Sequence, residues 1–186
     1  MSDALKIAIA GLGTVGAGTI ELLTKQADLL TQRCGRPLQV TAVCARDRSR
    51  DRGVDLSGCQ WFDDPVALAR DPGTDIFVEL MGGAEGAAKA SVEAALEAGK
   101  HVVTANKALL AADGNTLAKA AEATDVSLNF EAAAAGGIPI VKTLRETLAG
   151  NTVHRIYGIL NGTSNYILTR MEQERMDFDT CLAEAQ

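Results

Sequence analysis

Short apolar runs alternate with helix-length segments along most of this 186-residue chain. The apolar runs are residues 5–10, 38–45, 75–81, 101–106 and 126–132. The segments between them carry helix signals, such as Asp64-Pro65 at a start and Gly99 at an end. Nearly continuous apolar strands are typical of a parallel sheet that is covered on both faces. The pattern therefore predicts an α/β fold with a doubly wound parallel sheet.

The pattern changes after residue 135. The pattern predicts a doubly wound α/β domain over residues 1–135 and the start of a second unit over residues 136–186. In the second segment the sequence predicts a helix over 136–150, a strand over 154–160 and further helices up to Gln186. Because the helical pattern runs to Gln186 without a stop signal, we expect this second domain to be incomplete.

The charge balance limits the kind of partner. The net charge is -6 and the isoelectric point is about 4.9, and Lys and Arg form no basic stripe. We therefore expect a small-molecule ligand and no nucleic-acid partner. The cysteines and histidines lack metal-ligand spacing, so we expect free thiols in a reducing cytoplasm. There is no signal-peptide pattern and no bilayer-length apolar segment, so we expect no membrane partner.

A glycine-rich segment separates the first predicted strand from the first predicted helix. It consists of Gly11, Leu12, Gly13, Thr14, Val15 and Gly16. In such a segment the first glycine permits a tight turn, the second lets the backbone approach a pyrophosphate, and the third lets helix and strand pack closely. The N–H groups at the helix start then face an anion. Glycines also mark ordinary turns, but the strand-loop-helix context favours a dinucleotide site.

The second predicted strand ends in a charged segment, where the residue that reads the adenosine ribose is expected. Arg46 with Arg48 would suit a 2′-phosphate through charge-assisted hydrogen bonds, whereas Asp47 could accept one from a free 2′-hydroxyl. The sequence therefore favours NADP and leaves NAD use open. For Arg50 and Arg52, a solvated charged loop is an equally good interpretation.

Two later strands end at the same edge of the predicted sheet, beyond which ligands sit in this fold. Lys107 follows the run 101–106 and is a candidate catalytic residue, although a surface lysine in a first helical turn is the alternative. Gly82 and Gly83 would let the backbone lie against a nicotinamide ribose. Glu79 lies in an apolar strand, so it either points into the cleft or caps a backbone group.

Five separate segments together resemble the homoserine dehydrogenase family. They are IAIAGLGTVGAG at 7–18, VELMGG at 78–83, HVVTANKALLA at 101–111, FEAAAAGGIPIVKTL at 130–144 and GILNGTSNYILTRM at 158–171. The resemblance implies an oxidoreductase that interconverts L-homoserine and L-aspartate 4-semialdehyde with NAD(P)(H), in threonine, isoleucine and methionine biosynthesis. It implies that residues 1–135 are a Rossmann-like NAD(P)-binding domain and that residues 136–186 begin an α+β catalytic and dimerisation domain. It also implies a homo-oligomer, a dimer or tetramer, for the full-length protein.

The resemblance also implies roles for residues. Leu12, Thr14 and Val15 would touch the cofactor, and Arg46 would meet the 2′-phosphate. Lys107 would be the lysine of the TANK segment, beside nicotinamide and substrate. There a cation would stabilise the developing alkoxide, hold the substrate or relay a proton.

A monovalent cation, usually sodium, is a further implication of the resemblance. The matching ligands are the Glu131 side chain and the backbone carbonyls of Ala134, Gly136 and Ile138. Oxygen ligands fit a hard cation. From composition alone, the same EAAAAGG segment is a flexible hinge. The family turn at Asn161, Gly162, Thr163 and Asn165 would line the cleft, although its residues also suit an ordinary turn and helix cap.

Family members continue beyond these segments with a Gly-Tyr-Ala-Glu segment and an Asp/Gly-rich stretch that carries the substrate-binding acid and the proton-donating lysine. Neither occurs before Gln186. We therefore expect this polypeptide to bind NADP(H) and to turn over homoserine poorly or not at all. The alternatives are another NAD(P)-dependent amino-acid dehydrogenase, a nucleotide-sensing module, or a flavin or other nucleotide on the same loop.

Overall fold

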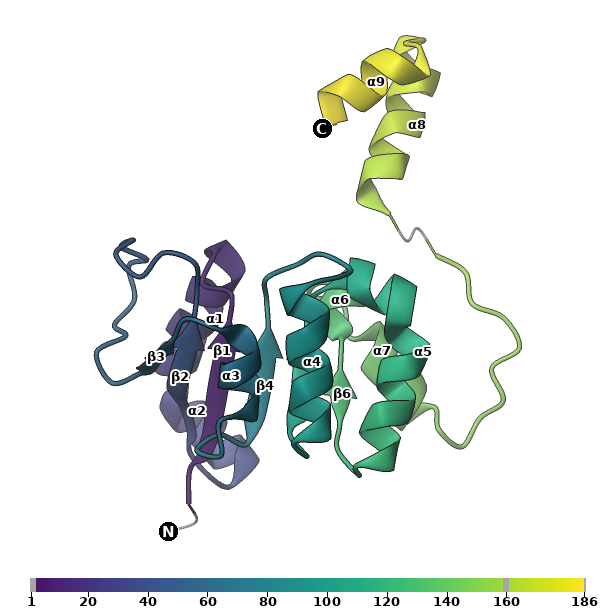
Figure 1. Ribbon diagram of the computed structural model, residues 1–186. Helices are drawn as coiled ribbons and strands as arrows, with labels where there is room; N and C mark the ends of the chain where they lie inside the picture. Colours follow the sequence, from purple (N-terminus) through teal and green to yellow (C-terminus); the bar gives the residue numbers. More distant parts are fainter. Residues whose placement is uncertain (1–2, 159–160, 186) are drawn as a thin grey trace. The chain divides into compact units, whose positions relative to one another are not determined.

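The computed structural model describes residues 3–158 and 161–185 (Figure 1). The chain divides into two compact units, Met1–Lys142 and Thr143–Gln186. The predicted domain boundary after residue 135 lies within the first unit and stays a prediction. No helix in the described part of the chain is long and apolar enough to cross a membrane.

The first unit contains a six-stranded sheet in the order β3-β2-β1-β4-β5-β6. The strands are β1 Leu5–Ala10, β2 Leu38–Cys44, β3 Gln60–Phe62, β4 Ile76–Glu79, β5 His101–Thr104 and β6 Leu128–Asn129. All neighbouring strands run parallel. The order reverses between β1 and β4, which is the switch point where ligands bind in a doubly wound sheet. The predicted Rossmann-like fold is confirmed.

Helices cover both faces of this sheet (Figure 1). They are α1 Thr14–Lys25, α2 Ala27–Cys34, α3 Pro65–Arg70, α4 Ala87–Glu97, α5 Lys107–Ala123, α6 Glu131–Ala134 and α7 Ile140–Lys142. Because side chains alternate along a strand, Ala8 and Ala10 of β1 face the cluster built with α3, α4 and α5. Ile7 and Ile9 face the other cluster, which includes Ile20 of α1. Burial on both faces explains why the strands are almost continuously apolar.

The helix signals in the sequence have the expected geometry, with one difference. The Asp64 carboxylate accepts hydrogen bonds from the Val66 and Ala67 N–H groups at 3.0 and 3.2 Å, so it caps α3 as predicted. Gly99 has a φ of +70° just after α4. The helical pattern over 19–33, however, is interrupted at Gln26, where α1 ends and α2 begins.

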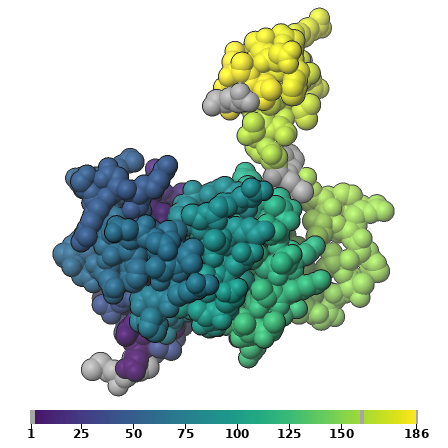
Figure 2. Space-filling view, in the orientation of Figure 1, coloured from purple at the N-terminus to yellow at the C-terminus, as the bar shows by residue number. Residues whose placement is uncertain are grey.

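The predicted loop over residues 46–64 was partly wrong, because it contains β3. This three-residue strand, Gln60–Phe62, pairs only with β2 and forms the edge of the sheet. Such a short run among polar residues has too few alternating positions to be distinguished from a loop. Figure 2 shows the segment after β2, in blue, as a raised part of the surface of the first unit.

The regular elements described in the second unit are all helical. This unit contains a π-helical turn at Thr143–Thr147, then α8 Gly162–Glu174 and α9 Phe178–Ala185. The continuous α-helix predicted over 136–150 is wrong. α7 begins only at Ile140, after Pro139, and the hydrogen bonds that follow span five residues, as in the bond from Leu148 N–H to Thr143 O. The strand predicted over 154–160 is also wrong over 154–158, which has no regular structure, while 159–160 lie outside the described residues. A strand needs a neighbour, and the described part of this unit offers none.

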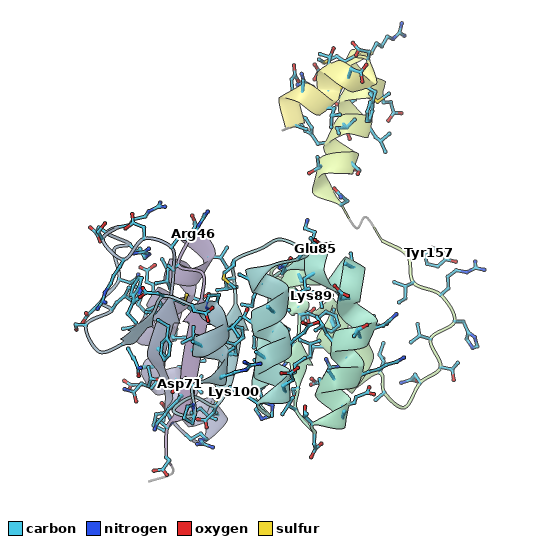
Figure 3. The ribbon with its side chains drawn as sticks, viewed as in Figure 1. Arg46, Asp71, Glu85, Lys89, Lys100 and Tyr157 are labelled. Carbon is cyan, nitrogen blue, oxygen red and sulfur yellow. The ribbon has the colours of Figure 1, made fainter. Side chains whose placement is uncertain are left out.

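A buried lysine lies at the amino-end edge of the sheet. Lys100 is only 5% exposed, and its Nζ donates to Asp71 O and, at 2.5 Å, to Thr74 Oγ1. Burial lowers the pKa of Lys100, against the opposing effect of Asp71 and Asp75. Figure 3 shows Asp71 and Lys100 at the opposite edge from Arg46.

Lys100→Met is expected to change how stability depends on pH. Below the ordinary Lys pKa of 10.5 and above the lowered one, the unfolded wild type binds more protons than the folded protein. Its free energy of unfolding therefore rises with pH across that interval, and the variant should lack this rise. Urea unfolding at several alkaline pH values measures the difference, with Lys119→Met as the exposed control. The buried cysteines are present in the wild type and in both variants, so their contribution to the pH dependence of stability cancels in the comparison. Parallel pH profiles for wild type and Lys100→Met would contradict the expectation.

Candidate functional site

The carboxyl ends of three strands meet around the glycine-rich segment. Gly11 N–H donates to Cys44 O at the end of β2, at 2.9 Å. Leu80 N–H, just after β4, donates to Ala10 O at 2.8 Å. The turn that follows β1 is therefore held between the ends of β2 and β4.

The three glycines of the motif have different surroundings. Gly11 has a φ of +100°, and a Cβ on it would lie 2.5 Å from Leu80 O. A Cβ on Gly16 would lie 2.0 Å from Gly11 O, whereas a Cβ on Gly13 would meet nothing within 4 Å. The first and third glycines are thus required by packing against the main chain, and the second faces open space. This matches the division of roles that the motif predicts.

The start of α1 suits an anion. Gly13 is the N-cap and provides no capping side chain, and the first turn has no acidic residue. The N–H groups at a helix start carry partial positive charge. A phosphate-bearing ligand therefore fits the residues present.

The predicted contacts of Leu12, Thr14 and Val15 with a cofactor stay predictions. Leu12 is 4% exposed and its side chain belongs to the core cluster with Ile9, so the side chain is not available to a ligand. Thr14 and Val15 are exposed at the helix start.

A buried carboxylate orders the turn after β4. Glu79 is fully buried, and its Oε1 accepts hydrogen bonds from Met81 and Gly82 N–H at 2.7 and 3.0 Å. Its Oε2 accepts one from Thr104 Oγ1 at 2.6 Å. Of the two interpretations of Glu79, the backbone cap is the one observed. The turn that contains Gly82 and Gly83 is therefore tied to the end of β5.

Asn106 links this turn to the helix that begins with Lys107. Its Nδ2 donates to Gly83 O at 2.6 Å, and its Oδ1 accepts from Leu109 N–H at 3.1 Å, so it is the N-cap of α5. Its own N–H donates to Thr104 Oγ1 at 3.0 Å. Lys107 itself is exposed at the carboxyl-end edge. Sequence reasoning missed Thr104, although Thr and Asn before a helix are residues that favour capping.

The segment after β2 presents Arg46 and engages Asp47. The Asp47 carboxylate accepts from Ser49 N–H and Oγ at 2.9 and 2.7 Å, and these bonds lower the pKa of Asp47. Arg48 lies over the Trp61 ring, 5.6 Å from its centroid. Arg46 is exposed and makes no hydrogen bond or ion pair with another described residue (Figure 3). The donors of Arg46 are therefore available to a ligand, whereas the Asp47 carboxylate is engaged by Ser49.

Two of the predicted cation ligands, Glu131 and Ile138, already accept backbone hydrogen bonds. Both carboxylate oxygens of Glu131 accept backbone hydrogen bonds, from Val141 and Lys142 N–H at 2.8 Å each. Ile138 O accepts from Ile140 N–H at 2.8 Å. A bound cation would have to share these oxygens with the backbone donors, and the set Glu131, Ala134, Gly136 and Ile138 stays a prediction. No cluster of three or more His, Cys, Asp or Glu suited to a metal occurs among the described residues.

The predicted turn at Asn161, Gly162, Thr163 and Asn165 lies in the second unit. Asn161 Oδ1 accepts from Ser164 N–H at 3.0 Å and caps α8. Asn165 N–H donates to Asn161 O at 3.2 Å. The helix-cap interpretation is therefore observed, and a place for this turn in the cleft stays a prediction.

Known proteins match this chain over nearly all its length. Residues 11–131 match the family described as homoserine dehydrogenase, NAD binding domain, and residues 139–186 match homoserine dehydrogenase. The homoserine dehydrogenase of Neisseria gonorrhoeae is 44% identical over 98% of this chain and 41% of its own length. That of Bacillus subtilis is 38% identical over 98% of this chain and 42% of its own length. The chain thus spans about 40% of the curated relatives it matches.

Solved structures give the same family. A homoserine dehydrogenase from Thiobacillus denitrificans aligns with a TM-score of 0.84 at 44% identity, over 98% of this chain and 42% of that one. A hyperthermophilic archaeal homoserine dehydrogenase in complex with NADPH aligns with a TM-score of 0.79 at 27% identity, over 98% of this chain and 60% of that one. On these matches the chain belongs to the homoserine dehydrogenase family, and its first unit carries that family's NAD-binding domain.

Proposed function

We propose that this chain is the NADP(H)-binding part of an enzyme that interconverts L-homoserine and L-aspartate 4-semialdehyde, with NAD(H) as the weaker cofactor. The observation that carries the proposal is the glycine loop, in which packing fixes Gly11 and Gly16 while Gly13 faces open space. Lys107 lies at the same carboxyl-end edge of the sheet. The related archaeal enzyme in complex with NADPH supports the choice of cofactor.

The residues divide the work at this edge. The N–H groups at the start of α1 bind the pyrophosphate, and Arg46 binds the 2′-phosphate. When bound, the cofactor supplies or accepts the hydride. Lys107 stabilises negative charge on the substrate oxygen, and such placed charges are commonly worth a few kcal/mol. The buried hydrogen bonds of Glu79 and Asn106 hold the backbone of the turn after β4 and of the start of α5, next to Lys107.

Arg46→Ala is expected to weaken NADP+ binding by roughly tenfold or more and to leave NAD+ binding unchanged, because only NADP+ carries the 2′-phosphate. Calorimetric titration of the 186-residue chain with each nucleotide measures both affinities. Arg33→Ala is the matched control, since it removes an exposed arginine from α2. Equal loss of both nucleotides in Arg46→Ala would refute its role, and binding of neither by the wild type would refute the proposed cofactor site.

A monovalent cation, sodium by preference, stays a separate proposal for the segment around Glu131. It requires the Val141 and Lys142 N–H groups to share or release the carboxylate oxygens. It enters no step described above, and sodium titration of the purified chain tests it.

For the full-length enzyme we propose a cytoplasmic dimer or tetramer, acting in threonine, isoleucine and methionine biosynthesis. The support is the membership of the chain in a family of biosynthetic oxidoreductases. Its partners are the small-molecule substrate and the cofactor.

A further inference from the structure

We propose that Arg52 is a positioning residue of the cofactor site, which orients the phosphate loop and ties to it the segment that carries Arg46. The proposal rests on the cofactor site proposed above and adds a residue to it. The sequence alone left Arg52 as a candidate for a solvated loop, and the structure contradicts that interpretation.

Arg52 is bound on three sides by backbone carbonyls. Its Nε donates to Leu12 O at 3.1 Å, its Nη1 donates to Arg50 O at 2.6 Å, and its Nη2 donates to Asp47 O. Arg52 is half-buried, whereas Arg46, Arg48 and Arg50 are exposed. Three of the five donors of Arg52 are thus engaged by backbone carbonyls, which is typical of a structural role, and Arg46 remains the candidate for binding a 2′-phosphate.

The contact with Leu12 O fixes the direction of an N–H group in the phosphate loop. Leu12 O and Gly13 N–H belong to one planar, trans peptide unit, so they point in opposite directions. When Arg52 holds the carbonyl on its own side, the Gly13 N–H must point away from Arg52. Gly13 is also the N-cap of α1 and faces open space. Arg52 therefore sets the orientation of the turn that leads into the anion-binding helix start.

The same guanidinium connects the two ends of the adenosine site. Asp47, whose carbonyl accepts from Arg52, is the neighbour of Arg46 in the chain. The guanidinium lies 5.4 Å from the centroid of the Trp61 ring on the edge strand β3. This cation–π contact restricts where Arg52 can lie. The pyrophosphate end and the ribose end are thus held at a fixed separation by one side chain.

Arg52→Met tests the proposal, because methionine keeps an unbranched side chain and removes every donor. Affinity for NAD+ and for NADP+ should fall by a similar factor, roughly tenfold. Both carry the pyrophosphate, and both would lose the hydrogen bond from a correctly oriented Gly13 N–H. Arg33→Met is the control, because Arg33 is an exposed arginine of α2 and makes no hydrogen bond with another described residue. It should change neither affinity by more than about twofold. Circular dichroism on heating verifies that both variants fold.

The Gly13 amide resonance gives a second readout that needs no cofactor. In the ligand-free 19.4 kDa chain, this resonance should shift in Arg52→Met and stay in place in Arg33→Met. Loss of NADP+ affinity alone would show that Arg52 contacts the 2′-phosphate, and that result overturns the proposal. Unchanged affinities or an unmoved Gly13 resonance also overturn it. If the wild type binds neither nucleotide, the proposed function fails, and the Gly13 resonance still decides whether Arg52 orients the loop.

Discussion

Gly16→Ala is expected to destabilise the first unit by about 3 kcal/mol and to abolish NADP(H) binding, whereas Gly13→Ala should lose binding and keep its stability. A Cβ at Gly16 would lie 2.0 Å from Gly11 O, so backbone must move to admit it. A Cβ at Gly13 meets nothing within 4 Å of the protein. It occupies the space through which a pyrophosphate must approach, and we expect a roughly hundredfold loss of affinity.

Urea unfolding and calorimetric titration separate these two effects. Gly18→Ala provides the control, because it also lies in α1 and a Cβ there meets nothing within 4 Å. Alanine should stabilise that helical position by about 0.5–1 kcal/mol and leave the affinity unchanged. Wild-type affinity in Gly13→Ala would show that the pyrophosphate does not lie on this loop. Wild-type stability in Gly16→Ala would show that the close contact with Gly11 O is absent in solution.

Glu79→Ala is expected to lower the free energy of unfolding by about 3 kcal/mol, because it leaves buried donors without an acceptor. The carboxylate accepts from Met81 N–H, Gly82 N–H and Thr104 Oγ1. Glu79→Gln keeps one acceptor oxygen in place, so it should cost less, about 1 kcal/mol.

The control for this series is Glu97→Ala. Glu97 forms an exposed ion pair with Arg70 at 3.4 Å, and its loss should change stability by less than about 0.5 kcal/mol. Equal unfolding free energies for Glu79→Ala and Glu97→Ala would show that water reaches the turn after β4 and replaces the carboxylate.

The parts of the fold that depend on local pattern could be predicted from the sequence. The places of five strands, their parallel direction and the glycine loop follow from apolar runs, helix-length spacers and a motif in a strand-loop-helix context. The start of α3, which Asp64 caps, also depends on a local sequence signal. Such features need only neighbouring residues to be interpreted.

The features that could not be predicted depend on residues far apart in the chain. Arg52 binds Leu12 O, 40 residues away in sequence, and Glu79 binds Thr104, 25 residues away. No local pattern distinguishes an arginine that binds backbone carbonyls from a solvated one, so the sequence alone left the role of Arg52 open. The strand expected over 154–158 failed for a related reason, since strand formation depends on a pairing partner that local pattern does not reveal.

Gly11 contacts the ends of β2 and β4, which are synthesised at different times. Its N–H is held by the end of β2, and its Cα lies against Leu80 at the end of β4. During synthesis, the segment that forms β1 leaves the ribosome before the segments that form β2, β3 and the helices between them. The segment that forms β4 follows after these. Contacts of such long sequence separation form only after the loop between them has closed. The phosphate loop of a newly made chain therefore takes its final conformation late in folding. The cofactor can then bind only those molecules in which β1, β2 and β4 have already paired.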